Sequence, residues 1–290
     1  MKRIALLFLI PLIAVLIASG CSRQQRSGTV RVKGSDTMVN LAQAWTEAYI
    51  KEHPSANIIV TGGGSGVGIA ALINGDTDIA TASRAMEPQE LSQAKAKGLD
   101  PQQFTVARDG VTVIVNPKNP VSNLDIDQLS HIYTGKITNW KQVGANDAKM
   151  VVLSRDKNSG THVFFLEHVV RKGNAKGPQQ YAPTVLMEVS TQAIADEAAQ
   201  NVNAIGYVGM GYVKPGVHKA LGIAPDATKK YVEPTVDNVI NGAYPIARPL
   251  YLYTPNKPMG AVKEFIDFVL SDQGQGIVAK MDFVPVRSVE

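Results

Sequence analysis

The chain of 290 residues has a single cysteine, and only 6% of its residues are aromatic and 19% charged. One cysteine has no disulfide partner within the chain. Basic residues exceed acidic ones by only four, an excess too small to indicate nucleic-acid binding through bulk charge. Hydrophobic residues make up 44%. This composition is that of a globular protein and excludes a disordered, collagen-like or multi-span membrane chain.

The N-terminus differs from the rest of the chain. Lys2 and Arg3 precede an uncharged apolar run, residues 4–19, which ends in small residues. A basic start, an apolar run and small residues before a cut are typical of a secretory signal peptide. As a transmembrane anchor the run is short, and Pro11 interrupts it. We therefore predict that residues 1–20 are removed and that the mature chain, with net charge +2, is exported.

The lone cysteine has an explanation at this position. It ends a segment that resembles a bacterial lipobox, Ala18-Ser19-Gly20-Cys21. The resemblance implies that the Cys21 thiol takes a diacylglycerol and becomes the new N-terminus, which would anchor the protein to the outer side of a membrane. Residues 21–28 are polar and have no apolar periodicity, as expected of a tether between the lipid and a folded domain.

From residue 29 onward, short β-like runs alternate with helical patterns of apolar residues. Such alternation favours an α/β architecture with a largely parallel sheet. The first part of the chain predicts strands at 30–32, 57–61 and 78–81, and helices at 41–49, 67–73 and 88–97.

A strongly apolar segment, 110–116, predicts a strand that leads into a second lobe, and 250–253 predicts a returning strand. We predict a first lobe from 28–110 plus 254–290 and a second from 111–253. Two connecting strands would act as a hinge, with a ligand cleft between the lobes.

Three segments place glycines and small hydroxyl residues between a predicted strand and a predicted helix: 33–37, 62–66 and 154–161. The start of a helix presents unpaired N–H groups and about half a positive charge. Glycine lets a ligand approach the backbone, and hydroxyls add donors, so a tetrahedral oxyanion suits such a site. Taken singly, each serine is as easily an N-cap and each glycine a turn residue. Three such segments together favour the anion site.

Two arginines belong to the same pattern. Arg155, in the third segment, offers a planar fork that suits two oxygens of a phosphate. Arg84 follows another predicted strand, where it could do the same or form a surface salt bridge.

Enzyme motifs are not met. Residues 62–68 do not match G-x-G-x-x-G in any register and lack the ending of a P-loop. Ser65 fails G-x-S-x-G because Val67 occupies the last glycine position. The five histidines are scattered without metal-binding spacing, and His162 is expected on a solvated helix face. We predict no catalytic residue, no metal and no cofactor.

In this order and spacing, the segments resemble the PstS-type phosphate-binding proteins of bacterial phosphate ABC transporters, from about residue 28 to 286. The resemblance implies a two-lobed periplasmic-binding-protein fold of type II that closes around phosphate. It implies a monomer that passes phosphate to a membrane permease. The matching motifs include Gly-Ser-Asp-Thr at 34–37, Gly-Gly-Gly-Ser-Gly at 62–66, Asp-Ile-Ala-Thr-Ala-Ser-Arg at 78–84, Ser-Arg-Asp-Lys-Asn-Ser-Gly-Thr at 154–161 and Ile-Gly-Tyr-Val at 205–208, together with the stretches 132–140 and 244–253.

The positions that match the family's motifs are expected to contact phosphate, with Ser35 beside them as an extra donor. They are Asp36, Thr37, Ser65, Ser83, Arg84, Arg155, Ser159, Gly160 and Thr161.

One position departs from the family. Many members carry an aspartate where Arg84 stands, and its carboxylate accepts the proton of bound phosphate. Such an acceptor rejects sulfate, which has no proton to donate. Our hypothesis is that Asp36 takes this role while Arg84 adds positive charge. The alternative is that Asp36 caps a helix and points away from the ligand.

Three other functions are compatible with parts of this pattern. A receptor for sulfate or molybdate would share the architecture without needing the acceptor carboxylate. A secreted phosphatase would need a metal cluster or an activated nucleophile. A phosphate sensor that signals to a membrane kinase would begin with the same binding step, so the sequence does not separate it from a transport protein.

Overall fold

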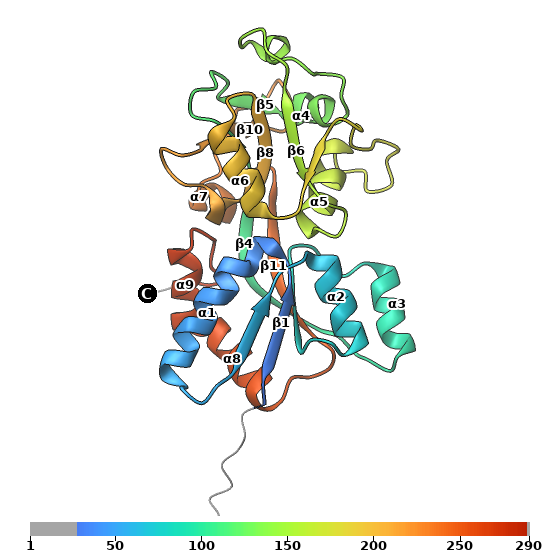
Figure 1. Cartoon of the computed structure of the whole chain (residues 1–290), viewed down its shortest axis with the longest axis vertical. Coiled ribbons are helices and arrows are strands. Elements are labelled where there is room, and N and C mark those ends of the chain that lie inside the picture. Colours follow the sequence, from blue (N-terminus) through green and yellow to red (C-terminus); the bar gives the residue numbers. More distant parts are fainter. Residues whose placement is uncertain (1–27, 289–290) are drawn as a thin grey trace, which may run out of the picture.

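A computed structural model describes residues 28–288. The predicted signal peptide, Cys21 and all of the tether but Gly28 lie outside the described residues. The rest folds into two lobes that follow one another along the long axis of the molecule (Figure 1), as the sequence predicted.

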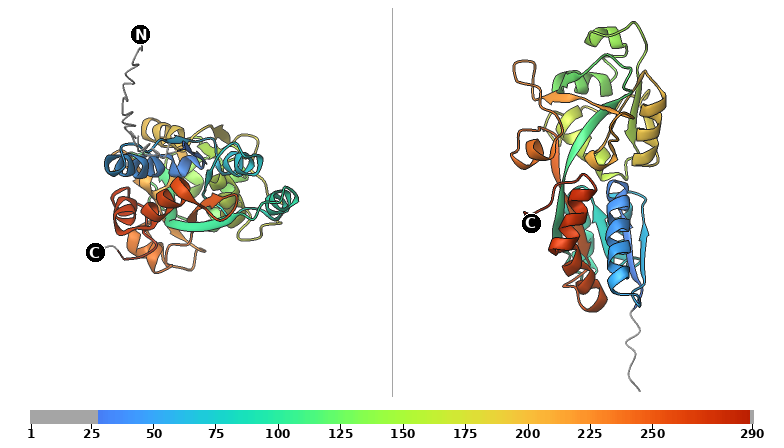
Figure 2. Two further views of the ribbon diagram at one scale, coloured as in Figure 1. Left: turned by 90° about the horizontal axis from the view of Figure 1, so that it is seen from below. Right: turned by 90° about the vertical axis from the view of Figure 1, so that its left-hand side faces the viewer.

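The first lobe is built on three parallel strands in the order β2-β1-β3. In β1, buried Val30 and Val32 flank exposed Arg31, the alternation of a strand with one covered face. Helices pack on both sides, α1 with α8 and α9 on one side and α2 with α3 on the other (Figures 1 and 2). The elements are β1 (Val30–Gly34), α1 (Val39–Glu52), β2 (Ile58–Thr61), α2 (Ser65–Asn74), β3 (Ile79–Ala82), α3 (Pro88–Ala96), α8 (Gly260–Leu270) and α9 (Asp272–Lys280).

Two strands connect the lobes. β4 (Gln102–Val115) pairs with β11 (Ala247–Thr254) as far as Gly110 and with β8 (Ala204–Gly209) from Val111 onward. A single strand therefore belongs to the sheets of both lobes, and its partner changes at the residue where we predicted the boundary. The predicted strand began only at 110, because residues 102–109 carry polar side chains that hide the strand pattern.

The return to the first lobe differs from the prediction. We assigned residues up to 253 to the second lobe, but β11 pairs with β3 and β4 along its whole length from Ala247. An apolar run indicates a strand without indicating which sheet it joins. Because the chain leaves on β4 and comes back on β11, these strands are antiparallel to their neighbours. The sheet is thus mixed, with parallel strands only in its outer parts.

The second lobe has the parallel strands β8, β6 and β7 in that order, and a separate pair of β5 with β10. The helix expected after segment 154–161 begins at Gly160, is α-helical only to Phe165 and continues as a π-helical turn to Val170. The elements are β5 (Asn123–Asp125), α4 (Ile126–Tyr133), β6 (Val151–Arg155), α5 (Gly160–Phe165), β7 (Leu186–Glu188), α6 (Thr191–Gln200), β9 (Lys219–Ala220), β10 (Gly222–Ala224) and α7 (Val236–Ile240), with short turns η1 (Asp36–Met38) in the first lobe and η4 (Met210–Tyr212) in the second.

Each lobe has a buried tryptophan. Trp45 Nε1 in α1 donates to Gly274 O of α9 at 2.8 Å, and Trp140 Nε1 donates to Asn203 O beside β8 at 3.0 Å. Both indoles thus cover apolar core while their only N–H is satisfied. Between residues 28 and 288, no helix has both the length and the apolar character needed to cross a membrane.

Candidate functional site

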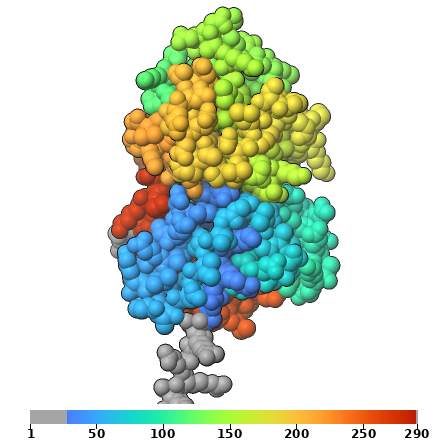
Figure 3. Space-filling model, in the orientation of Figure 1, coloured from blue at the N-terminus to red at the C-terminus, as the bar shows by residue number. Residues whose placement is uncertain are grey.

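The loops that follow β1, β2 and β3 in the first lobe face the loop that follows β6 in the second. In parallel sheets the carboxyl ends of neighbouring strands lie at one edge, which is where ligands of α/β proteins bind. The lobes touch here directly (Figure 3), and Gly66 N donates to Asn158 O across the boundary at 2.9 Å. The three segments picked out in the sequence therefore lie together.

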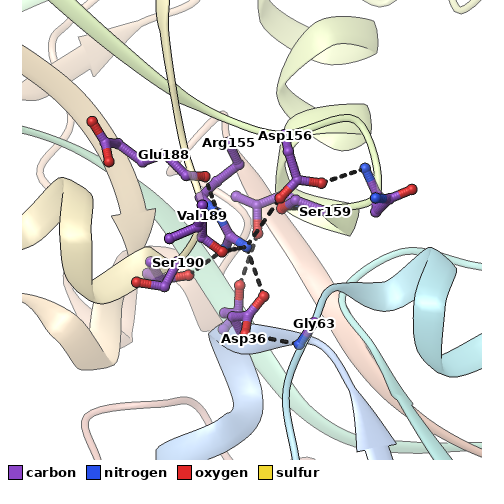
Figure 4. Close-up of polar contacts among 12 residues, drawn as sticks. Asp36, Gly63, Arg155, Asp156, Ser159, Glu188, Val189 and Ser190 are labelled. Atoms are coloured by element: carbon purple, nitrogen blue, oxygen red, sulfur yellow. Dashed lines mark hydrogen bonds and ion pairs between the residues drawn. The ribbon is translucent and has the colours of Figure 1, made fainter.

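Arg155, at the end of β6, is the central cation of this region. Its side chain is 1% exposed. Nε donates to Glu188 O at 3.2 Å, Nη1 to Thr191 Oγ1 at 2.9 Å, and Nη2 to Val189 O at 3.1 Å (Figure 4). These partners come from the end of β7 and the start of α6, so the second lobe holds the guanidinium rigidly at its surface.

Asp36, in η1 of the first lobe, binds this guanidinium. Its Oδ2 accepts from Arg155 Nη2 at 2.6 Å, and its Oδ1 accepts from Gly63 N at 3.1 Å (Figure 4). A Cβ on Gly62 would lie 2.3 Å from Oδ1, so glycine is required beside the carboxylate. Asp36 thus faces the opposite lobe, and the alternative in which it caps a helix and points away does not describe this arrangement.

Four hydroxyls gather beside the Asp36–Arg155 pair. Thr37 Oγ1 of the first lobe lies 2.8 Å from Thr161 Oγ1 of the second. Ser65 Oγ, at the start of α2, lies 3.2 Å from Ser83 Oγ and accepts from Ser83 N at 3.0 Å. All four residues are at most 3% exposed. Gly160 closes the group, since a Cβ there would lie 2.4 Å from Ser65 Oγ.

Two predicted serines have local roles. Ser159 caps α5, because its Oγ accepts from Thr161 N at 3.2 Å and from His162 N at 3.3 Å. Ser35 is buried next to Asp36, and its N–H donates to Thr81 O at 2.9 Å. The structure thus gives Ser35 a backbone bond next to Asp36, while the Ser159 oxygen already accepts two bonds.

Arg84 is placed differently from Arg155. Its Nη1 and Nη2 bind the two carboxylate oxygens of Glu90 in α3 at 2.8 and 2.7 Å, and Nη1 also donates to Ala85 O at 2.9 Å. Glu90 therefore occupies the fork that we assigned to the anion. Among the described residues, the buried Arg84 Nε has no hydrogen-bond partner.

Sequence reasoning missed a third arginine, Arg248 of β11. It pairs with Asp109, its cross-strand neighbour on β4, through Nε at 3.1 Å and Nη2 at 2.8 Å. Both side chains are at most 2% exposed. Burial lowers the pKa of Arg248, and the Asp109 carboxylate opposes that shift. An available signal was a charged residue directly before the apolar run that starts at Gly110, since unpaired charges are almost never buried.

The charges of these arginines are therefore balanced within the protein. Arg155 is paired with Asp36, Arg84 with Glu90 and Arg248 with Asp109. A site of this kind attracts an anion through local donors, since the arginines add no net charge. Nowhere in residues 28–288 do three or more His, Cys, Asp or Glu side chains form a group able to hold a metal ion.

His162 supports the Arg155 loop from behind. We expected it on a solvated helix face, but it is 9% exposed, and its Nδ1 lies 2.7 Å from Arg155 O. Its ring centroid lies 4.5 Å from that of Tyr181. Burial lowers the pKa of His162. The expectation was wrong because α5 packs into the lobe on the side that carries the histidine.

A groove of about 380 Å³ lies between the lobes next to the hydroxyls. Residues 83–88 line it from the first lobe, and Val163, Phe164, Glu167 and His168 line it from the second. Ser83 and Arg248 belong both to this groove and to the site.

Comparison with known proteins identifies the family. The sequence matches the PBP superfamily domain over residues 20–273. It is 32% identical to the phosphate-binding protein PstS of Staphylococcus epidermidis over 255 residues, which are 86% of this chain and 76% of that protein. The chain belongs to the PstS phosphate-binding proteins of the PBP superfamily. The PstS of Pseudomonas aeruginosa is 31% identical over 277 residues, covering 90% of this chain and 84% of the relative.

Solved structures of related proteins agree with the fold. A protein from Clostridium perfringens, described as a phosphate ABC transporter substrate-binding protein and solved with bound phosphate, is 33% identical. It superposes with a TM-score of 0.79 over 89% of this chain and 100% of that one. An ABC-type phosphate transport receptor from Vibrio cholerae is 31% identical, with a TM-score of 0.69 over 88% and 99% of the two chains. The predicted two-lobed α/β fold is thus confirmed.

Proposed function

We propose that this protein binds inorganic phosphate between its lobes and delivers it to the permease of an ABC transporter. The observation that carries the proposal is the convergence of hydroxyls from both lobes, Thr37, Ser65, Ser83 and Thr161, beside buried Arg155. Hydroxyls and guanidinium N–H groups are donors that match the oxygens of a phosphate. The relatives named above, one of them solved with phosphate, support the same ligand.

The residues fall into three roles in this proposal. The four hydroxyls and Arg155 contact phosphate, with Ser35 and Gly160 adjacent to them. Ser159 orients the start of α5. Arg84 stays with Glu90 and fixes the loop between β3 and α3, so we no longer assign it to the anion.

Asp36 is the residue that we assign to selection. Each of its oxygens accepts one bond from the protein, from Gly63 N and Arg155 Nη2, and a carboxylate has further lone pairs with which to accept the proton of phosphate. Sulfate offers lone pairs instead of a proton, so the two acceptors would repel. A receptor for sulfate or molybdate would not need this carboxylate.

Export and anchoring complete the proposal. We infer that residues 1–20 are cleaved and that Cys21 carries a lipid, which holds a monomeric binding protein outside the cytoplasmic membrane. Radioactive palmitate should label the wild-type protein in growing cells, and Cys21→Ala should abolish the label and release the protein from membranes. Label that persists in the Cys21→Ala variant would contradict lipidation at this residue.

The proposed ligand is tested by a calorimetric titration of phosphate, with sulfate and molybdate as competitors. The protein is first unfolded, dialysed and refolded, to remove carried-over ligand. Tight one-to-one binding of phosphate that excess sulfate does not disturb is the expected result. Equal binding of sulfate would make the protein a general oxyanion receptor. No heat from folded protein with any of the ions would contradict the proposal. Incubation with a generic phosphate ester should give no turnover, since we propose binding without covalent chemistry.

A further inference from the structure

Arg248 lies where the two connecting strands pass between the lobes. It stands opposite Asp109 in the register of β11 and β4. Asp109 is itself fixed, because its Oδ1 accepts from Met210 N at 2.9 Å while its Oδ2 binds the guanidinium. The position of this arginine is therefore set by the hinge strands rather than by the loops of either lobe.

The remaining donors of Arg248 reach site residues of both lobes. Nη2 lies 3.0 Å from Thr161 Oγ1 and 3.4 Å from Thr37 Oγ1, and Nη1 donates to Ser83 O at 3.0 Å. An arginine can only donate, so a hydroxyl oxygen that it contacts acts as an acceptor. The two threonine hydroxyls are 2.8 Å apart, so one of them donates to the other. The pair then keeps one hydroxyl proton for a further partner.

We propose that Arg248 is a positioning residue for anion binding, which orients the Thr37–Thr161 hydroxyl pair so that its one remaining proton points toward the ligand. This inference rests on the proposed function. A hydroxyl without such a neighbour is free to rotate and to present a lone pair to an anion, which weakens binding. Because Arg248 contacts both hydroxyls only when the lobes meet, it also stabilises the closed arrangement.

The first test is a double-mutant cycle in phosphate titrations, with Arg248→Met, Thr161→Val and the double variant. Each single variant should weaken phosphate affinity by about 10- to 100-fold, as expected for loss of a hydrogen bond to a charged group. If Arg248 acts through the Thr161 hydroxyl, the double variant should bind phosphate about as tightly as the single variant with the lower affinity. Losses that multiply would overturn the proposal.

The second test separates positioning from folding. Arg248→Met leaves a buried, unpaired Asp109, which destabilises a protein. The variant Asp109→Asn with Arg248→Met removes that charge, so its thermal midpoint should recover while its phosphate affinity stays low. Arg248→Lys keeps a charge for Asp109 but not the fork, so it should retain more stability than affinity. If phosphate affinity recovered together with stability in the Asp109→Asn, Arg248→Met variant, the role of Arg248 would be purely structural and the proposal would be overturned.

Arg31→Met serves as the control, because Arg31 forms an exposed pair with Asp78 on the first lobe. By itself it should leave phosphate affinity unchanged, and combined with Thr161→Val it should add nothing to the loss caused by Thr161→Val. The two proposals can fail separately. Wild-type protein that binds no phosphate contradicts the proposed function, whereas wild-type binding with multiplying losses contradicts only the role of Arg248.

Discussion

Arg84 and Arg155 were selected from the sequence for the same reason, but their carboxylate partners lie on different sides of the lobe boundary. Arg84 binds Glu90 six residues later in the same lobe. Arg155 binds Asp36, which belongs to the other lobe and is 119 residues away in sequence. The Arg84 pair can persist whether the lobes are open or closed. The Arg155 pair can form only when they close.

This difference indicates which side of the site responds to closure. In the first lobe, Arg84 has its carboxylate partner and a backbone acceptor within the same lobe. In the second lobe, all three nitrogens of the Arg155 guanidinium donate to partners of that lobe. The carboxylate that balances its charge comes from the opposite lobe. An anion that bridges Arg155 and the hydroxyls of the first lobe would stabilise closure in the same way. Substitutions at the two arginines should therefore have unequal effects.

The largest effect is expected for Arg155→Met, which leaves Asp36 without its partner and the site without its buried guanidinium. Phosphate affinity should fall by about 100-fold or more, in line with truncation of one member of a buried charged pair. Isothermal titration measures it, with Arg31→Met as the exposed control. An affinity close to that of the wild type would place the ligand elsewhere.

Asp36→Asn tests the opposite side of the same pair. The amide presents a donor where the carboxylate only accepts, so sulfate should no longer be repelled. We expect the ratio of phosphate to sulfate affinity to fall by about 10-fold or more. Competition titrations measure this ratio, and Asp78→Asn, in the exposed pair with Arg31, is the matched control. Unchanged discrimination against sulfate would show that Asp36 is not the proton acceptor.

Gly160→Ala tests the close approach of the lobes. Its Cβ would lie 2.4 Å from Ser65 Oγ and 2.7 Å from Ser83 Oγ, both across the boundary. Closure should be hindered, with phosphate affinity lowered by about 10-fold and a larger radius of gyration in X-ray scattering with phosphate present. Gly28→Ala, where a Cβ meets nothing within 4 Å, is the control. Wild-type affinity and compactness would show that the ligand-bound lobes do not approach this closely.

Arg84→Met should affect stability more than binding. Because Glu90 already occupies the fork, phosphate affinity should change by less than about 3-fold. The thermal midpoint should fall by about 2–6 °C, since the partly buried Glu90 loses its partner. Calorimetric melting and titration of the same sample measure both. A loss of affinity comparable to that of Arg155→Met would remove the distinction between the two arginines.

The smallest effect concerns acid stability of the second lobe. Burial lowers the pKa of His162 in the folded protein, so the unfolded chain binds the proton more tightly. The contribution to stability is complete above the ordinary histidine pKa of about 6.5 and declines as the pH falls below it. Between pH 7 and 5, the thermal midpoint of the wild type should fall further than that of His162→Gln. Equal slopes would show that His162 does not set this dependence.

Much of the site was predictable because its parts are local in sequence. The Ser-Arg-Asp-Lys-Asn-Ser-Gly-Thr segment at 154–161 contains a strand end, a turn, the N-cap Ser159 and the start of α5, all within eight positions. For Arg84, a surface salt bridge was one of the two alternatives considered, and its partner Glu90 lies only six residues away. The strand 102–109 was missed because its polar residues obscure the alternation that marks a strand.

The sequence by itself determined the α/β alternation, the two connecting segments and the chemistry of the anion-binding loops. These depend on periodicity, turn residues and helix starts, which act over a few residues. The tertiary structure alone decided that Asp36 meets Arg155 and that Asp109 meets Arg248. These partners are 119 and 139 residues apart. The first pair meets through the closure of the lobes, and the second through the register of β4 and β11. The local sequence identifies neither partner, because which charges meet in the interior depends on the elements that the fold brings together.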